Sequence, residues 1–381
     1  MIILKGGSVH PMHTDPFVGD VAFDNGKIVQ IGANIQIPGA EIVDVSGKFV
    51  LPGLVDAHSH IGLQESGTRE VDHNEKGRPI TPEMRGIDSI YPADAAFAEC
   101  RALGITTSVT GPGSINLIGG TFAAIKNVGS TVEEMLIRDA VAMKMAVGEN
   151  PKFNYIGLGK EPFSRMGSAA MIREALVKAQ NYAKKKRLGT LVDTDLGLEA
   201  LVRVLDGEMP MKIHCHRADD IVTAIRIMNE FDIRYTLDHC SEGYLIPEVL
   251  EEALNTRCNG IIIGPIICRN RKLERRNHLR TRFAAKMYQL GIPFAICTDW
   301  PDTTSECLMF AAALGAAHGM PEEEALRSIT INAARAVGIA DRVGSLEPGK
   351  DADIAIFDGN PLNCLNLCCA TYIDGRLVYQ A

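Results

Sequence analysis

The stretch FVLPGLVDAHSH, residues 49–60, carries the strongest signal for the fold and its chemistry. It is mostly apolar and β-prone, is broken once by Pro52-Gly53, and ends in two histidines, His58 and His60. Side chains alternate across a strand, so residues two apart point the same way. Two imidazoles that leave a buried strand on one side form half of a divalent-metal site. Two unrelated histidines near a turn would give the same short pattern, so the rest of the chain has to decide.

The composition is that of an ordinary globular protein, with 46% hydrophobic and 23% charged residues in a chain of 381. A net charge of -8 argues against nucleic acid or an anionic membrane as the main partner and leaves a small-molecule substrate. No apolar run is long enough to span a bilayer, and the first residues do not read as a signal peptide. The ten cysteines have no regular spacing, which is typical of reduced thiols. We therefore expect a cytoplasmic protein, and leave open whether it forms a homo-oligomer.

Both ends of the chain read as short β-strands separated by turns. Asn25-Gly26 is a strong hairpin signal near the start, and Asp374-Gly375 marks a turn near the end. Neither end is large enough to bury a core of its own. We expect residues 1–51 and 342–381 to form one small β-sandwich domain together.

The intervening residues, 52–341, alternate between strand and helix patterns. The candidate strands end at His60, Gly111, Val147, His216, His239, Gly264 and Asp299. The candidate helices cover residues 169–185, 221–231, 246–255 and 279–290. Continuous apolar strands alternating with helices predict an α/β fold with a parallel sheet, and about eight such units indicate a (β/α)8 TIM barrel. An open doubly wound sheet is the alternative, weakened because no G-x-G-x-x-G follows the first strand.

The polar residues fall where these strands end. They are His58 and His60, His214 and His216, His239, and Asp299. In a barrel the carboxyl ends of the strands surround one mouth, so four strands would aim metal-binding residue types at one point. Such groups converge only when something compensates for their loss of water, and a divalent cation does so.

With these positions in place, the chain resembles the amidohydrolase superfamily over essentially its whole length. The run at residues 52–60 looks like the family's first-strand signature, and His214, His239 and Asp299 look like its later strand-end signatures. The runs at 330–335 and 344–353 are similar to the family's closing segment. Within the superfamily the chain resembles imidazolonepropionase-like and prolidase-like members.

The resemblance implies that His58, His60, His214, His239 and Asp299 bind a divalent metal, with Asp299 also the general base and His239 beside it in catalysis. The metal would lower the pKa of a water molecule, and Asp299 would pass the proton to the leaving nitrogen. The implied reaction is hydrolysis of a C–N bond in a cyclic amide or a peptide-like substrate, either a dipeptide or an N-acyl amino acid.

The number and identity of the ions stay open. Two-metal relatives use a bridging carboxylated lysine or a glutamate, and both Lys144 and Glu149 lie at about the right place in the sequence. We favour a carboxylated Lys144 slightly. Without either bridge the site would hold one ion. We expect zinc, although such a site also accepts manganese or iron.

Several residues near the strand ends are candidates for substrate binding. His216 and Arg217 follow His214 and could orient a substrate carboxylate, and Arg165 enters a helix. Arg217 could equally pair with Asp219. The basic run at 269–276 could attract an anion or form an ordinary solvated surface.

Two other functions remain as alternatives. Superfamily deaminases carry a glutamate soon after the fifth-strand histidine, and Arg217 stands three positions after His214, which counts against a deaminase. A non-catalytic scaffold of the same fold would normally have lost metal ligands. This chain keeps each expected ligand, and only the residue that would bridge two ions is left open.

Overall fold

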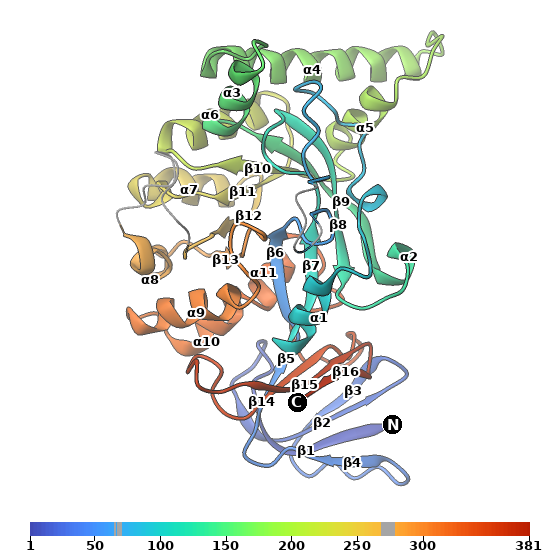
Figure 1. Cartoon of the computed structure of the whole chain (residues 1–381), viewed down its shortest axis with the longest axis vertical. Coiled ribbons are helices and arrows are strands. Elements are labelled where there is room, and N and C mark those ends of the chain that lie inside the picture. The colour runs from blue at the N-terminus through green and yellow to red at the C-terminus, as the bar shows by residue number, and fades with distance from the viewer. Residues whose placement is uncertain (65, 67–70, 268–278) are drawn as a thin grey trace.

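The computed structural model describes residues 1–64, 66, 71–267 and 279–381, and its strands form two sheets (Figure 1). One sheet lies at the end of the molecule where both termini are found, and the other forms the wall of a barrel surrounded by helices. The basic run at 269–276 lies outside the described residues. The predicted fold class, an α/β barrel with a small β domain from both chain ends, is confirmed. The exact domain bounds stay a prediction.

Eight strands form the barrel wall, in the order β13-β12-β11-β10-β9-β8-β7-β6. They are β6 (Leu54–Ser59), β7 (Ile105–Thr110), β8 (Ile118–Lys126), β9 (Leu136–Ala146), β10 (Met211–Cys215), β11 (Tyr235–His239), β12 (Cys258–Ile263) and β13 (Ala295–Ile296). Hydrogen bonds bring the two ends of this sheet together, because His58 O accepts from Asp299 N at 3.0 Å and Trp300 O accepts from His60 N at 2.8 Å. The barrel is therefore nearly closed.

The expectation of an all-parallel sheet is wrong at β8. This strand runs antiparallel to both β7 and β9, while the other neighbouring pairs are parallel. The reason is the connection, since only the glycine-rich loop 111–117 joins β7 to β8, and a parallel return needs a longer crossover. All nine residues of β8 are nevertheless buried. The segment that follows β6 helps cover this strand, with bridges from Ile80 to Ile118 and from Arg85 to Thr121.

Helices pack around the barrel strands. They are α1 (Ala95–Ala102), α2 (Val132–Met135), α3 (Glu149–Gly157), α4 (Arg165–Arg187), α5 (Leu196–Leu205), α6 (Ala218–Glu230), α7 (Pro247–Leu254), α8 (Phe283–Gln289), α9 (Cys307–Ala317), α10 (Glu322–Ser328) and α11 (Ile331–Ala336), with 3-10 turns η1 (Gly86–Asp88), η2 (Gly243–Leu245) and η4 (Arg280–Arg282). The four predicted helices correspond to α4, α6, α7 and α8. Polar N-caps of the observed helices include Ser164 before α4 and Asp195 before α5, each accepting a backbone N–H. Among the described residues, no helix combines the length and hydropathy needed to cross a membrane.

The second sheet takes strands from both ends of the chain. They are β1 (Ile2–Val9), β2 (Phe17–Asp24), β3 (Lys27–Gly32), β4 (Glu41–Asp44), β5 (Phe49–Pro52), β14 (Ile354–Phe357), β15 (Cys368–Ile373) and β16 (Arg376–Gln380). The chain leaves this sheet at β5 and returns at β14, which pairs antiparallel with β5. The two predicted turns are confirmed, because Asn25-Gly26 and Asp374-Gly375 join adjacent strands with positive φ angles at all four residues.

Gly53 is the point at which the chain passes from one sheet to the other. Its N–H donates to Asp353 O at 2.8 Å. A Cβ atom at this position would lie 2.1 Å from Oγ1 of Thr106, so only glycine fits the passage. Close by, Lys126 from β8 forms ion pairs with Asp353 at 2.6 Å and Asp351 at 2.9 Å, which ties the barrel wall to the second sheet.

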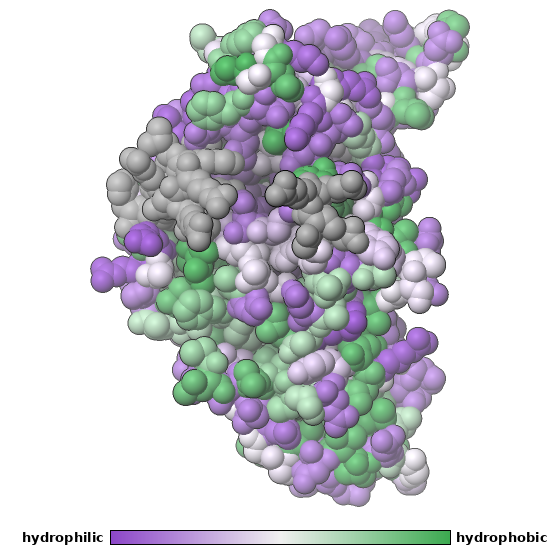
Figure 2. Space-filling model, viewed as in Figure 1, coloured by the Kyte–Doolittle hydropathy of each residue, from purple (hydrophilic) through white to green (hydrophobic). Residues whose placement is uncertain are grey.

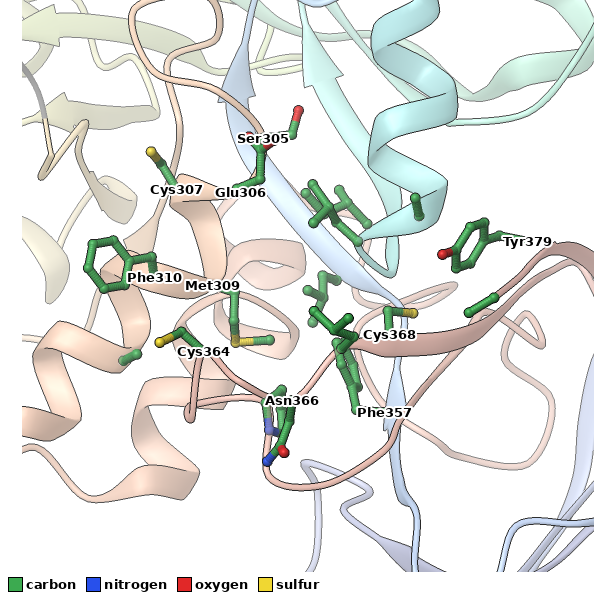
Figure 3. A pocket seen from close by; sticks show the side chains of 18 residues that line it. Ser305, Glu306, Cys307, Met309, Phe310, Phe357, Cys364, Asn366, Cys368 and Tyr379 are labelled. Carbon is green, nitrogen blue, oxygen red and sulfur yellow. The ribbon is translucent and has the colours of Figure 1, made fainter.

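An apolar cavity of about 420 Å³ lies at the amino-terminal end of the barrel strands, next to Leu54 and Ile105 (Figure 3). Its lining is mainly apolar, with Met309 and Phe310 on α9 and Phe357 on β14. On the face drawn in Figure 2, hydrophobic residues are more frequent where α9 and α10 approach the second sheet than over the helices at the other end. This cavity is separate from the polar residues at the strands' carboxyl ends.

Candidate metal centre

His58 and His60 lie at the carboxyl end of β6 and are buried, with 0% and 6% of their surface exposed. Each ring is held through Nδ1. Asp238 Oδ2 lies 2.6 Å from Nδ1 of His58, and Gly111 O lies 2.7 Å from Nδ1 of His60. A carbonyl or carboxylate oxygen can only accept, so both Nδ1 atoms carry the proton. The Nε2 lone pairs therefore face the barrel mouth, as a metal ligand requires.

His239 ends β11 and is held in the same way. Its Nδ1 donates to Gly264 O at 2.6 Å, which leaves Nε2 as the atom able to bind a metal. The backbone of His239 has a φ of 74°, and Asp299 has a φ of 56°. Residues other than glycine rarely adopt this left-handed conformation, and such strain concentrates at functional sites. Two of the six strand-end candidates are therefore held in conformations that their sequence does not favour.

Asp299 follows β13 and meets the two β6 histidines. Its Oδ1 lies 3.4 Å from Nε2 of His58 and 3.4 Å from Nε2 of His60. The carboxylate is 5% exposed, so it lies at the inner end of the mouth. His58, His239 and Asp299 offer ligand atoms within 4.8 Å of one another, a spacing that one ion can bridge.

Lys144 on β9, three strands along the barrel wall from β6, reaches the same point. Its side chain is fully buried, and Nζ lies 3.4 Å from Nε2 of His58. The amine also lies over the ring of Phe122, 5.3 Å from its centroid. Burial lowers the pKa of Lys144 to about 8, although the negative charges of Asp238 and Asp299 act in the other direction.

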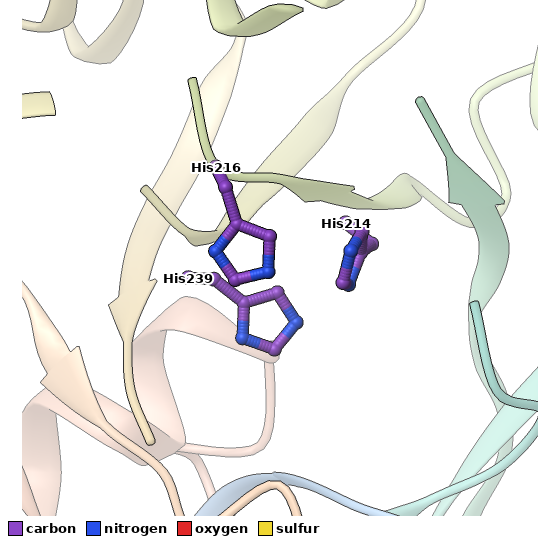
Figure 4. A group of neighbouring side chains, drawn as sticks. All are labelled: His214, His216 and His239. Carbon is purple, nitrogen blue, oxygen red and sulfur yellow. The ribbon is translucent and has the colours of Figure 1, made fainter. Parts of the chain in front are cut away.

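His214 and His216 extend the cluster from β10 (Figure 4). The ring of His214 lies 4.6 Å from that of His216 and 4.5 Å from that of His239, and the rings of His216 and His239 are stacked at 4.8 Å. These three residues also offer ligand atoms within 4.8 Å of one another. The ring of His214 is contacted through Nε2, by the amide of Asn150 at 3.1 Å.

Beneath the histidines, Asp238 and Lys212 form a buried pair. Nζ of Lys212 lies 3.0 Å from Asp238 Oδ2 and 3.0 Å from Ala57 O. Burial alone would raise the pKa of Asp238, but the charge of Lys212 and the hydrogen bond from His58 outweigh it and hold that pKa well below its usual range. The ionised Asp238 can therefore keep the His58 ring oriented throughout the neutral pH range.

The two imidazoles at the end of β6 stay neutral. Burial, reinforced by the charge of Lys144, lowers the pKa of His60 to about 3 and also lowers the pKa of His58. Neutral imidazole is the form that binds metals. Among the described residues, the donor set is thus chemically suited to a divalent transition metal.

A cavity of about 360 Å³ lies above the cluster, with His60 and Asp299 among its lining residues. The segment after β6 contributes His73, whose ring stacks on that of His60 with centroids 4.9 Å apart. Burial lowers the pKa of His73 to about 3. The cavity gives a small molecule access to the imidazoles and to the carboxylate.

The remaining candidates lie elsewhere. Arg217 is exposed and pairs with Asp219 at 2.9 Å, the alternative that the sequence left open. Arg165 opens α4, pairs with Asp220 at 2.8 Å and lines a different hollow of about 300 Å³. Glu149 is half-buried at the first turn of α3. None of these three lines the cavity above the cluster.

Sequence reasoning missed Asp238, Asn150 and His73. Asp238 carried a signal, since it is a charged residue inside an otherwise uncharged buried strand, next to His239. Asn150 and His73 carried none, because Asn150 lies in the first turn of α3 and His73 in a connection whose path cannot be deduced from periodicity.

Comparison with known proteins explains this arrangement. The model of the amidohydrolase family matches residues 49–378. This chain belongs to the amidohydrolase family. It is accordingly a hydrolase that acts on carbon–nitrogen bonds, and the predicted superfamily is confirmed.

Among solved structures, an amidohydrolase from Thermotoga maritima MSB8 is similar at 40% identity with a TM-score of 0.96, and the match covers 100% of both chains. The amidohydrolase tasK of Hapsidospora irregularis is 29% identical over 96% of this chain, which spans only 40% of that protein. An imidazolonepropionase of Fusobacterium nucleatum subsp. nucleatum is 26% identical, over 95% of this chain and 92% of its own length.

Proposed function

We propose that this chain is a divalent-metal-dependent amidohydrolase that hydrolyses a C–N bond of a small cyclic amide or peptide-like molecule. The observation that carries the proposal is the position of Asp299, whose carboxylate lies 3.4 Å from Nε2 of both His58 and His60 at the inner end of a cavity. A carboxylate so placed can both bind a metal and accept a proton.

The residues that would hold the metal are His58, His60, His214, His239 and Asp299, with zinc the ion that we propose. When bound, the ion would supply Lewis acidity, which polarises a carbonyl and makes a water molecule acidic near neutral pH. Asp238 and the carbonyl groups of Gly111 and Gly264 fix the rings that face it. These contacts support a preorganised site.

Lys144 is the proposed bridge between two ions, in carboxylated form. Its Nζ lies 3.4 Å from His58 Nε2, inside the cluster, and it comes from β9, three strands along the wall from β6. Glu149 starts α3 and contributes to no described metal-binding group, so it is the weaker candidate. The carboxylate of a carbamate would also replace a buried cation by a metal ligand.

The chain's own residues would divide the catalytic work. Asp299 would take a proton from the attacking water and deliver it to the leaving nitrogen. His239, next to Asp299 in the cluster, would hold the metal, and His216, stacked against His239, would face the carbonyl oxygen as charge develops there. The deaminase alternative gains nothing from the structure, because Arg217 is exposed and paired with Asp219.

The test is a comparison of the wild type with Asp299→Asn, each loaded with zinc. We expect turnover of lactams or N-acyl amino acids to fall by about 10²–10⁴-fold while the thermal unfolding temperature stays close to that of the wild type. Asp341→Asn is the matched control, since the Asp341 side chain is 64% exposed. Full activity of the Asp299 variant would refute the general-base role, and failure to retain zinc in the wild type would refute the metal centre.

A further inference from the structure

Asp56 is a buried carboxylate to which the proposed reaction gives no task. It lies in β6, two residues before His58, and 4% of its surface is exposed. Its Oδ1 accepts from the backbone N–H of His58 at 3.3 Å and from that of Thr298 at 3.2 Å. Its Oδ2 accepts from the hydroxyl of Thr298 at 2.5 Å. One side chain therefore holds both a proposed metal ligand and the residue directly before Asp299.

Thr298 connects Asp56 to the turn that carries Asp299. Oγ1 of Thr298 accepts from Trp300 N at 3.0 Å, and its carbonyl oxygen accepts from Thr303 Oγ1 at 2.6 Å. Together with the two bonds to Asp56, these contacts give every polar atom of Thr298 a partner, in a residue that is only 1% exposed. Hydrogen bonds thus fix the residues on both sides of Asp299.

The backbone of Asp299 is in a conformation that needs this support. Its φ of 56° is rare for residues other than glycine. Such a conformation persists only where the surrounding structure determines it by more contacts than one. Asp299 N also donates to His58 O at 3.0 Å. The result is a carboxylate whose Oδ1 lies 3.4 Å from Nε2 of both His58 and His60.

We propose that Asp56 and Thr298 are positioning residues, which fix the left-handed turn at Asp299 and thereby aim its carboxylate at the metal centre. The inference rests on the proposed function of Asp299 and adds the two residues that prepare it. Neither of them belongs to the described lining of the cavity above the cluster. Without the hydroxyl of Thr298, the N–H of Trp300 and an oxygen of Asp56 would lose buried hydrogen bonds, so the turn would relax.

Zinc binding by Thr298→Val tests the proposal, because valine keeps the shape of threonine but lacks the hydroxyl. We expect the zinc affinity, measured by competition with a chromophoric chelator, to fall by about 10–100-fold. Thr298→Ser keeps the hydroxyl and should stay within about threefold of the wild type. Thr371→Val is the matched control in the second sheet, since Thr371 is as deeply buried and donates to Arg101 O at 2.7 Å. Equal affinities of Thr298→Val and Thr298→Ser would overturn the inference.

The fluorescence of Trp300 reports on the same turn without metal or substrate. Trp300 is the only tryptophan in the chain, and it is 7% exposed. We expect the emission of metal-free Thr298→Val to shift to longer wavelength, because a relaxed turn admits water to the indole. The emission of Thr298→Ser and Thr371→Val should match that of the wild type. An unshifted emission in Thr298→Val would contradict the proposed fixing of the turn.

Kinetics separate positioning from substrate binding. In the zinc-saturated enzyme, Thr298→Val should lower kcat by about 10–100-fold and change KM by less than about threefold. Asp56→Asn combined with Thr298→Val should be no slower than the slower single variant, within about threefold, because the two residues act as a unit. Multiplied losses would show that Asp56 does not act through Thr298 and would overturn the proposal.

Asp299→Asn distinguishes failure of this inference from failure of the proposed function. Full activity of Asp299→Asn would refute the general base and, with it, the need to position that residue. An inactive Asp299→Asn beside a Thr298→Val that turns over like the wild type would refute the positioning role alone.

Discussion

Two buried lysines, Lys126 on β8 and Lys144 on β9, lie on neighbouring strands of the barrel in opposite surroundings. Lys126 has ion pairs with Asp353 at 2.6 Å, Asp351 at 2.9 Å and Asp374 at 3.3 Å. Burial alone would lower the pKa of Lys126, but these carboxylates outweigh it and raise that pKa. Lys144 instead lies 3.4 Å from a histidine nitrogen, and burial lowers its pKa to about 8.

The difference separates a charge cluster that stabilises the fold from one that is suited to metal binding or catalysis. Around Lys126 the charges compensate one another, so the cluster is explained by the folded state itself. Around Lys144 the direct contacts are the imidazole of His58 and the ring of Phe122, and the charges of Asp238 and Asp299 act on its amine without outweighing the effect of burial. A protein keeps such an arrangement when the residue has a task other than stability.

The sharpest test of the comparison is Lys126→Met. The variant should lose about 3–5 kcal/mol of unfolding free energy, because Asp353 would stay buried without a cation. Urea unfolding at pH 7 measures this. Lys178→Met is the control, since Lys178 forms an exposed pair with Glu174, and its loss should be below about 0.5 kcal/mol. A small loss of unfolding free energy in Lys126→Met would contradict the stabilising role assigned to the cluster around Lys126.

Asp238→Asn tests the third buried lysine, Lys212, which is paired like Lys126 but lies beside the candidate metal centre. Because Asp238 also orients His58, zinc affinity should fall by about 10–100-fold. Competition with a chromophoric chelator measures the affinity. In the double variant Asp238→Asn with Lys212→Met, stability should recover while zinc affinity stays weak. Recovery of both would show that Asp238 serves only to balance Lys212.

Lys144→Met should behave unlike Lys126→Met. Removal of a buried amine that has no carboxylate ion pair should change the unfolding free energy of the metal-free protein by less than about 1.5 kcal/mol. The zinc content should fall from about two ions per chain to about one, as measured by mass spectrometry of the metal. A loss of stability equal to that of Lys126→Met would place both lysines in the structural class.

The smallest expected effect is a change in acid sensitivity. Burial alone would raise the pKa of Asp351, but Lys126, Lys27 and Arg342 outweigh it and lower that pKa. Asp351 therefore contributes its full stabilisation above the pKa of the unfolded chain, about 3.9, and this stabilisation is lost as the pH falls through the lower pKa of the folded state. Burial raises the pKa of Asp353, which gives the opposite sign. Stability should therefore decline less steeply between about pH 6 and pH 3 in Asp351→Asn, and more steeply in Asp353→Asn. Urea unfolding at each pH measures this. These assignments would be contradicted if the unfolding free energy of both variants fell with pH at the same rate as that of the wild type.

Much of this architecture could be predicted from the sequence, because buried strands that end in histidine or aspartate carry both the period of a sheet and the chemistry of a site. Periodicity indicates where a strand lies but not its direction, so the antiparallel β8 was missed. The same limit applies to Asn150 and His73, which reach the cluster along loops and a helix turn. Arg165 shows a different limit. The sequence predicts a guanidinium group at this position but does not show that it forms an ion pair with Asp220.

The hydrogen bonds that bring β6 and the end of β13 together have a consequence for how the chain folds. The β7-β8-β9 meander pairs consecutive segments, whereas the contact between His58 and Asp299 joins residues far apart in the chain, so we expect the meander to form early and the seam between β6 and β13 late. The proposed ligands His58, His60 and Asp299 lie on the two sides of that seam. Zinc uptake during refolding would therefore report the moment at which the barrel closes.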